Sequence, residues 1–354
     1  MKRLSPVLIL LLLLLCIGTN ANTINETTVQ NSIRTGTLVA VGDISFSGIS
    51  HFAINDPDYP WGDTKDLLTS ASVLIGNQEN PISSRGKIYT DKKWILRTDP
   101  RAIQALLNAG FDVVTLANNH MMDYGPLALE DTLNILDKAN ILHTGAGMNL
   151  NEARKPAIFI TADGTKFAFL AYSLVYPEIF WASSSRPGTP YGDPNFFIPD
   201  IQRAKTMADF VVVSFHWSNE LIVKPRDYQK AYGKKSIDAG ATIVLGHHPH
   251  VLQGLEVYKG GLIAYSLGNF IFGNRSSKTK DSIVLAIDYD KSGLLQARLY
   301  PLNTNNLEVN FRTTRRRGAD AERVLQDLRT YSKEFKTVIE SNEGVGVIKI
   351  RTGE

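Results

Sequence analysis

Cysteine is almost absent from this chain of 354 residues. The single cysteine, Cys16, lies close to the N-terminus, and residues 17–354 contain none. This excludes disulfides and thiolate metal ligands from that part of the protein. Any metal ion there must be bound by His, Asp, Glu or Asn side chains.

The chain also has no large net charge of either sign. The 38 Lys and Arg residues face 35 Asp and Glu residues, which gives a formal net charge of +3. This balance is too even for a protein that coats a polyanion by its net charge. We therefore expect no nucleic-acid partner, and other partners must be inferred from individual sites.

The one long apolar run lies in residues 7–17. It follows Lys2 and Arg3 and precedes a polar stretch at residues 18–34. An apolar run of this length is too short to cross a hydrocarbon core of ~30 Å as a helix, and the order of segments is that of a signal peptide. Residues 1–35 are thus expected to form a leader and a flexible tether, and the protein to be exported to the cell envelope.

Two kinds of processing stay open. One is cleavage after Ala21, which gives a secreted or periplasmic protein. The other is lipid attachment at Cys16, which gives a membrane-attached lipoprotein. Leu13 fits a lipobox, whereas Leu15 stands where a smaller residue is usual.

Residues 36–354 have the pattern of one α/β domain. Apolar runs without polar alternation are typical of strands buried on both faces. Five such runs end in polar residues, at 37–41, 73–75, 113–117, 210–215 and 242–245. Helical spacing follows at 100–109, 126–139 and 228–239, and an Asp-Gly turn at 163–164 predicts a hairpin, so the sheets should be mixed. We expect a motif core over 37–272 and a C-terminal extension over 273–354, with strands at 282–289, 294–300 and 345–350 and a helix at about 319–340.

Five of the seven histidines follow these predicted strands. They are His120, His216, His247, His248 and His250. In open α/β sheets, ligands bind beyond the carboxyl ends of the strands, so these side chains should converge on one cleft. Imidazole and carboxylate ligands together suit Zn, Mn or Fe, and a dinuclear centre follows as a hypothesis.

Six blocks of sequence, in order from about residue 37 to 272, resemble those of the CapA family of poly-γ-glutamate capsule biosynthesis proteins. The blocks are Val41-Gly42-Asp43, residues 76–82, residues 116–120 with 123–125, His216-Trp217 with Glu220, residues 246–251 and residues 265–270. Their order is also similar to that of the calcineurin-like metallophosphoesterase superfamily. The resemblance implies a four-layered α/β/β/α metallophosphoesterase-like sandwich with mixed sheets.

The same resemblance implies roles for individual residues. The metal ligands would be Asp43, Glu79, Asn119, His216, His248 and His250. His120 would donate a proton to the leaving group and Asp123 would orient it. Residues expected to contact the substrate are Asn77, Trp217, Glu220 and Asn269.

Two departures from the pattern bear on the metal site. Ser45 stands where metallophosphoesterases usually carry a histidine, so one of the two metal positions is in doubt. Pro249 interrupts the last block, and which two of His247, His248 and His250 bind metal stays open.

Simpler explanations remain open for many of these residues. Asp43 and Glu79 are residue types that cap helices, and Asn119 tolerates left-handed turns. Trp217 is either a wall of the cleft or part of the core, Glu220 a turn cap and Asn269 a loop support. The basic cluster Lys92, Lys93, Arg97 and Arg101 either neutralises an anionic polymer or faces solvent. We assign Arg315, Arg316 and Arg317 to solvent, and treat His51 and His143 as structural or solvated.

The resemblance implies a metal-dependent hydrolase or transferase in the synthesis of poly-γ-glutamate or a related surface polymer. Its partners would be that anionic polymer and a membrane synthase complex. The bond that reacts, a phosphoryl ester or a γ-glutamyl amide, stays open. The alternative is a non-catalytic accessory protein that binds the polymer or its synthase and has a structural metal site. Ser45 favours this alternative, whereas His120 favours the enzyme.

Overall fold

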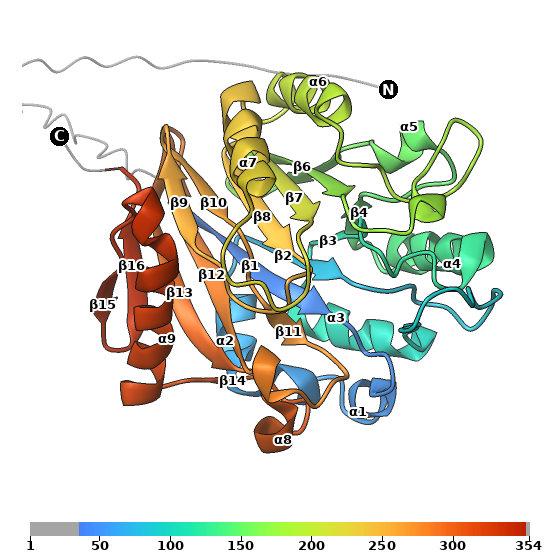
Figure 1. Cartoon of the computed structure of the whole chain (residues 1–354), viewed down its shortest axis with the longest axis horizontal. Helices are drawn as coiled ribbons and strands as arrows, with labels where there is room; N and C mark the ends of the chain where they lie inside the picture. Colours follow the sequence, from blue (N-terminus) through green and yellow to red (C-terminus); the bar gives the residue numbers. More distant parts are fainter. Residues whose placement is uncertain (1–34, 352–354) are drawn as a thin grey trace, which may run out of the picture. The chain divides into compact units, whose positions relative to one another are not determined.

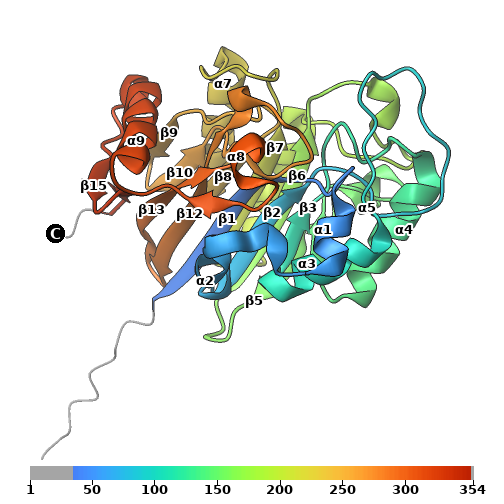
Figure 2. The same cartoon turned by 90° about the horizontal axis from the view of Figure 1, so that it is seen from below.

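In the computed structural model, residues 35–351 are described (Figure 1). The expected leader and tether, with Cys16 and both processing routes, lie outside the described residues apart from Thr35. Two β-sheets pack face to face, and helices cover the outer face of each (Figures 1 and 2). The expected α/β/β/α order of four layers with mixed sheets is confirmed.

The first sheet contains a parallel half and an antiparallel half that meet at β1 (Gly36–Ile44). β1 runs parallel to β2 (Val73–Gln78) on one side and antiparallel to β12 (Asp281–Asp290) on the other. The strand order is β15-β16-β13-β12-β1-β2-β3-β4, with β11 paired to β1 and β14 to β13. The remaining strands are β3 (Val113–Thr115), β4 (Leu142–Thr144), β11 (Asn269–Ile271), β13 (Gly293–Asn303), β14 (Thr314–Arg315), β15 (Glu340–Asn342) and β16 (Val345–Lys349).

The second sheet has a parallel centre with an antiparallel strand at each end, in the order β5-β6-β7-β8-β10-β9. Its strands are β5 (Ala157–Ile160), β6 (Lys166–Ser173), β7 (Phe210–His216), β8 (Ile243–His247), β9 (Leu255–Tyr258) and β10 (Gly261–Ala264). The Asp-Gly turn predicted at 163–164 does join the hairpin β5–β6. The two sheets bury apolar residues against each other, such as Leu38, Phe169 and Leu285.

Helices on the first sheet include α3 (Ile103–Ala109) and α4 (Gly125–Lys138), which bury Leu106 and Leu129 against that sheet. On the second sheet, α6 (Pro194–Lys205) and α7 (Asp227–Ala239) do the same with Ile201 and Ile237. The other helices are α1 (Ser50–Asn55), α2 (Lys65–Thr69), α5 (Leu150–Ala153), α8 (Asn306–Val309), α9 (Gly318–Ser332) and the 3₁₀ helices 59–64, 100–102, 178–180, 277–279 and 333–335. Among residues 35–351, no helix combines the length and apolar character needed to cross a membrane.

Two expectations for the C-terminal extension are wrong. The helix α9 ends at Ser332, not near residue 340, because Lys336 has a left-handed backbone (φ 58°) and β15 begins at Glu340. Arg316 does not face solvent. Its side chain is 7% exposed and pairs with Asp281, which anchors the chain between β14 and α9.

Candidate metal centre

The centre lies where the carboxyl ends of strands from both sheets meet. In the first sheet, Asp43 on β1 is paired in register with Asn77 on β2, and Glu79 follows directly after β2. In the second sheet, His216 ends β7 and is paired with His247, which ends β8. Because parallel strands end at one edge, side chains far apart in the sequence are brought together there.

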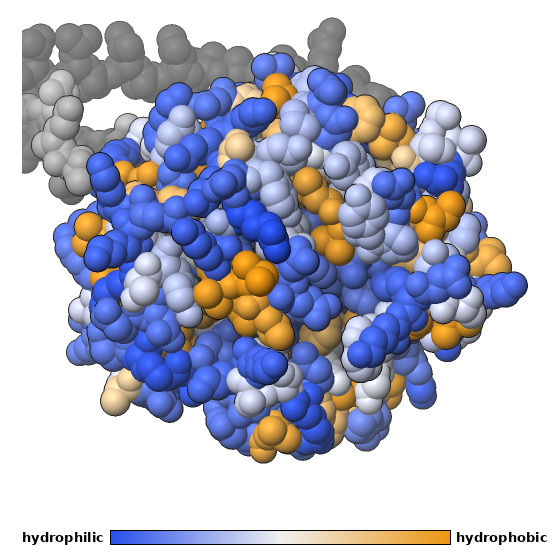
Figure 3. Space-filling view, viewed as in Figure 1, coloured by the Kyte–Doolittle hydropathy of each residue, from blue (hydrophilic) through white to orange (hydrophobic). Residues whose placement is uncertain are grey.

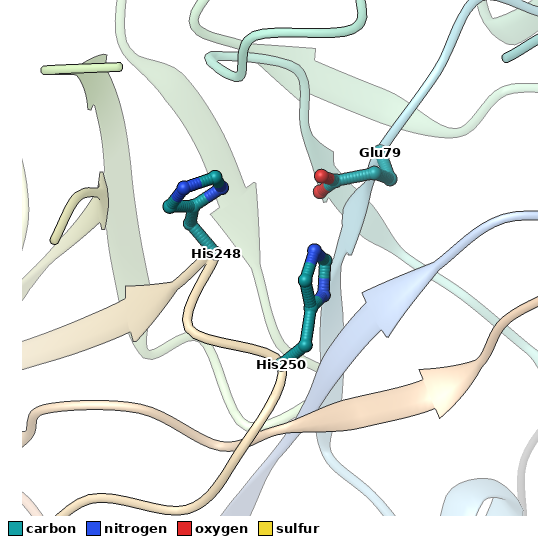
Figure 4. Close-up of side chains that lie close together, drawn as sticks. All are labelled: Glu79, His248 and His250. Atoms are coloured by element: carbon teal, nitrogen blue, oxygen red, sulfur yellow. The ribbon is translucent and has the colours of Figure 1, made fainter. Parts of the chain in front are cut away.

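Two overlapping sets of side chains have the geometry of a metal site. One ligand atom from each of Glu79, His248 and His250 lies within 4.8 Å of the others, and the same holds for Asp43, Glu79 and His216. Figure 4 shows the Glu79 carboxylate and the two imidazoles of the first set around one common space. Glu79 belongs to both sets, so the five candidate side chains share one place in the fold.

The remaining candidates lie in the same cluster. Asn119 Oδ1 is 2.9 Å from Nε2 of His216, and that nitrogen is 3.4 Å from Oε1 of Glu79. His250 Nδ1 is 3.2 Å from Asp43 Oδ2, and His247 Nδ1 is 3.1 Å from Asp43 Oδ1. All three histidines of the last block therefore contact or adjoin the cluster.

Several buried polar atoms in this cluster lack a hydrogen-bond partner. They include Glu79 Oε1, His216 Nδ1 and His248 Nδ1. Burying a polar group without a hydrogen-bond partner costs free energy. A bound cation would offset that cost, because imidazole nitrogens and carboxylate oxygens are metal ligands. The residues present thus fit a divalent metal ion, and imidazole with carboxylate suits Zn, Mn or Fe.

Burial and neighbouring charges set the protonation of the cluster. Burial alone would raise the pKa of Asp43, but hydrogen bonds with His247 and His250 hold this pKa well below its usual value. Burial and the Asp43 charge raise the pKa of Glu79 well above its usual value. Burial lowers the pKa of His216 strongly and that of His248 to about 3. Neutral imidazoles are the form that binds metal.

The backbone around the histidine block is tightly constrained. His248 and His250 adopt positive φ angles of 92° and 56°, which few residues other than glycine occupy without strain. Gly246 has no room for a side chain, since a Cβ there would lie 1.9 Å from the carbonyl oxygen of Tyr265. The segment is thus held in an unusual path that turns His248 and His250 toward Glu79.

His120 and Asp123 form a buried pair next to the cluster. His120 Nδ1 is 2.6 Å from Asp123 Oδ2, and burial lowers the pKa of His120 despite this partner. Lys92 reaches the same pair. Its Nζ lies 2.6 Å from Asp123 Oδ1 and 3.0 Å from His120 Nδ1, and it also donates to the carbonyl oxygen of Asn119.

The sequence predicts that Lys92 belongs to a basic cluster on a solvated or polymer-binding face. The structure places it inside the site instead. Its loop, residues 83–98, has little regular structure, so no periodicity in the sequence could have indicated its direction.

Three of the four expected substrate contacts form hydrogen bonds within the protein. Asn77 Nδ2 donates to Asp43 Oδ1 and Glu79 Oε2, at 2.9 and 2.6 Å, and so holds the two carboxylates together. Asn269 Oδ1 accepts a hydrogen bond from His250 Nδ1 at 2.8 Å. Trp217 is fully buried, stacks on Phe215 and donates to the carbonyl oxygen of Tyr265. Each of the three is 2% exposed or less.

Glu220 is the fourth expected contact, and it borders open space. It lines two pockets that flank the cluster. The His248 pocket, of about 750 Å³, also contains Asn119, His248 and the side chains of Tyr191, Tyr228 and Tyr232. The His120 pocket, of about 460 Å³, also contains Ser45, Trp94, His120, His250 and Arg275.

Leu221 and Val223, just beyond Glu220, are each about two-fifths exposed. Figure 3 shows a hydrophobic patch near the middle of an otherwise mostly hydrophilic face, where Figure 1 places the loop between β7 and α7. Leu221 also lines the His120 pocket, so the wall of that pocket is partly apolar.

Comparison with known proteins identifies one matching family and several relatives of this chain. Residues 37–274 match the family described as "Bacterial capsule synthesis protein PGA_cap". The chain is 37% identical to the PGA biosynthesis protein CapA of Bacillus subtilis (strain 168), over 67% of this chain and 63% of that protein. It thus spans less than two thirds of that relative's length. It is 34% identical to the capsule biosynthesis protein CapA of Bacillus anthracis, over 75% of this chain and 67% of that protein. It is 29% identical to a probable polyglutamine synthesis accessory protein of Mycobacterium tuberculosis (strain CDC 1551 / Oshkosh), over 71% of each.

Proposed function

This chain belongs to the family of bacterial capsule synthesis proteins, and on that premise we propose that it is a metal-dependent hydrolase or transferase. Its substrate would be poly-γ-glutamate or a related anionic surface polymer, as the names of its relatives suggest for those proteins. The observation that carries the enzymatic part is the buried pair His120–Asp123, which adjoins the cluster but belongs to neither candidate ligand set. A purely structural metal site has no use for such a pair.

We propose the following roles for the side chains of the site. Asp43, Glu79, Asn119, His216, His248 and His250 would hold the metal, with Asn77 and Asn269 ordering three of them. A bound divalent metal would polarise the electrophile and activate water. His120 would donate a proton to the leaving group from Nε2, because Nδ1 is held by Asp123. The His120 pocket gives that ring access to a ligand.

An accessory role is the second candidate function. The name of the M. tuberculosis relative describes an accessory protein, which supports this alternative for the present chain. Ser45 supports it too, since a serine hydroxyl is a weak ligand and it borders the His120 pocket beside His250. In that case the metal would only stabilise the fold, and the pockets would bind polymer or synthase without turnover.

We place this function outside the cytoplasm. The support is the signal-peptide layout of residues 1–35 and the lack of cysteine in residues 17–354. A membrane synthase complex would be the partner, reached through a lipid on Cys16 or through the leader itself.

The decisive experiment compares two substrates on one preparation. The purified chain is loaded with Mn²⁺ or Zn²⁺ and assayed on a γ-glutamate oligomer and on a generic phosphodiester. We expect turnover of one of them, lost with a chelator and lost in His120→Ala, and unchanged in the control His51→Ala. His51 is exposed and lines neither pocket. Stoichiometric metal without turnover of either substrate would support the accessory role instead.

A further inference from the structure

Glu220 is the residue that the two pockets share. It follows His216 by four positions, and its carboxylate forms no ion pair or hydrogen bond with any residue in the described range 35–351. An unpaired carboxylate at the junction of two pockets can accept hydrogen bonds from a cationic group of a ligand.

The His120 pocket also carries a charge of the opposite sign. Arg275 and Glu220 are the only lining residues with a permanent charge, and neither pairs with the other. The Arg275 guanidinium has no carboxylate partner among residues 35–351. It donates two long hydrogen bonds, to Asn306 O (3.3 Å) and Asn310 Oδ1 (3.4 Å), and stacks 4.7 Å from the ring of Phe311. A guanidinium has five N–H donors, so others remain for a ligand.

The wall of this pocket is apolar. Trp94, Leu96, Leu221 and Phe272 line it, and Trp94 is 62% exposed. Apolar side chains of this kind favour the methylene groups of a ligand over water. The His248 pocket differs, because Glu220 is its only charged lining residue and its wall carries several tyrosines.

From these features we propose that the His120 pocket binds an amino-acid-like group, with its ammonium at Glu220, its carboxylate at Arg275 and its methylene groups against the apolar wall. The inference rests on the proposed function and narrows its substrate class. The amino-terminal residue of a γ-linked glutamate chain has this chemistry, and so does free glutamate. Either ligand brings an amino-acid group next to His120.

The test measures equilibrium binding to the metal-loaded full chain by calorimetry, with recovered ligand checked by mass spectrometry. The probes are tri-γ-glutamate with a free amino end, its N-acetylated form, and free glutamate. Acetylation removes the ammonium and should weaken binding to the unaltered protein about tenfold. In Glu220→Gln the two trimers should bind alike, and Arg275→Gln should weaken both trimers by a similar factor.

The controls Glu343→Gln and Arg312→Gln lie outside both pockets and should keep the tenfold difference. Free glutamate that binds as well as the trimer identifies the free amino acid as the ligand, and tighter binding of the trimer identifies the chain end. The proposal is overturned if the unaltered protein binds both trimers equally, or if the difference survives in Glu220→Gln. Failure of the turnover assay leaves this result standing, since binding is measured without turnover.

Discussion

The ammonium of Lys92 lies 2.6 Å from one carboxylate oxygen of Asp123, while the other oxygen of that carboxylate holds the ring of His120. Asp123 is fully buried, and the Lys92 side chain is 14% exposed. Lys92 thus holds the Asp123 carboxylate in place, and that carboxylate orients His120, the proposed proton donor. It is a positioning residue, because it does not line either pocket.

Removal of Lys92 should cost stability, because it leaves the buried Asp123 carboxylate without its cation. We expect Lys92→Met to lower the free energy of unfolding by about 3 kcal/mol, measured by urea denaturation in the presence of a chelator. The double variant Lys92→Met/Asp123→Asn should lose less than the sum of the single losses. Lys93→Met is the matched control, since Lys93 is exposed and forms no ion pair among residues 35–351. Strict additivity would show that the two side chains are not coupled.

His248→Ala should remove metal and thermal stability together. A metal that binds only the folded chain stabilises it by mass action, about 2.7 kcal/mol at a hundredfold excess over the dissociation constant. We therefore expect less metal per chain by elemental analysis and a smaller rise in melting temperature on addition of Mn²⁺ or Zn²⁺. His143→Ala is the control, because His143 contacts Asp137 on the surface. Unchanged metal content in His248→Ala would exclude His248 as a ligand.

Acidification should destabilise the metal-free protein through His248. Its pKa is about 3 in the folded chain and about 6.5 when unfolded, so the unfolded chain binds more protons between these values. The stabilising contribution is complete above pH ~6.5 and is lost as pH falls toward about 3, by at most ~1.4 kcal/mol per pH unit. Denaturant melts of chelator-treated protein at several pH values should show a shallower loss in His248→Gln than in the unaltered chain. Parallel curves for the two proteins would assign the acid sensitivity to other groups.

If Cys16 carries a lipid, Cys16→Ser should release the protein from membranes. The stretch at residues 18–34 has no apolar face of its own that could hold it there. Fractionation of cells with an antibody against the folded domain measures this directly. Unchanged membrane attachment of Cys16→Ser would identify a retained leader as the anchor, and full-length protein in the cytosol would contradict export.

The convergence of Asp43, Glu79, His216, His248 and His250 could be predicted because each one follows an apolar run, and parallel strands end at one edge. The role of Trp217 could not be read in the same way. It directly follows β7, as a cleft residue would, but alternation along the backbone turns its indole toward Phe215 and Tyr265 in the core.

The long-range ion pairs also could not be predicted from the sequence. Arg316 is neutralised by Asp281, 35 positions away, and Lys92 by Asp123, 31 positions away. Such contacts depend on how loops pack after the sheets form, and no local spacing encodes them. The C-terminal end of α9 could not be predicted for a related reason, since β15 forms only by pairing with β16.

The central position of β1 has a consequence for the smallest fragment that can fold. Residues 36–40 of β1 pair with residues 285–289 of β12, yet the stretch matched to the family stops at residue 274. A truncated chain ending there would leave residues 36–40 of β1 without a neighbour on that side, with unpaired backbone groups that invite aggregation. We therefore expect the family stretch alone, residues 37–274, not to fold stably in this protein. A homologue that shares only that stretch would need another segment, or another molecule, to pair with its first strand.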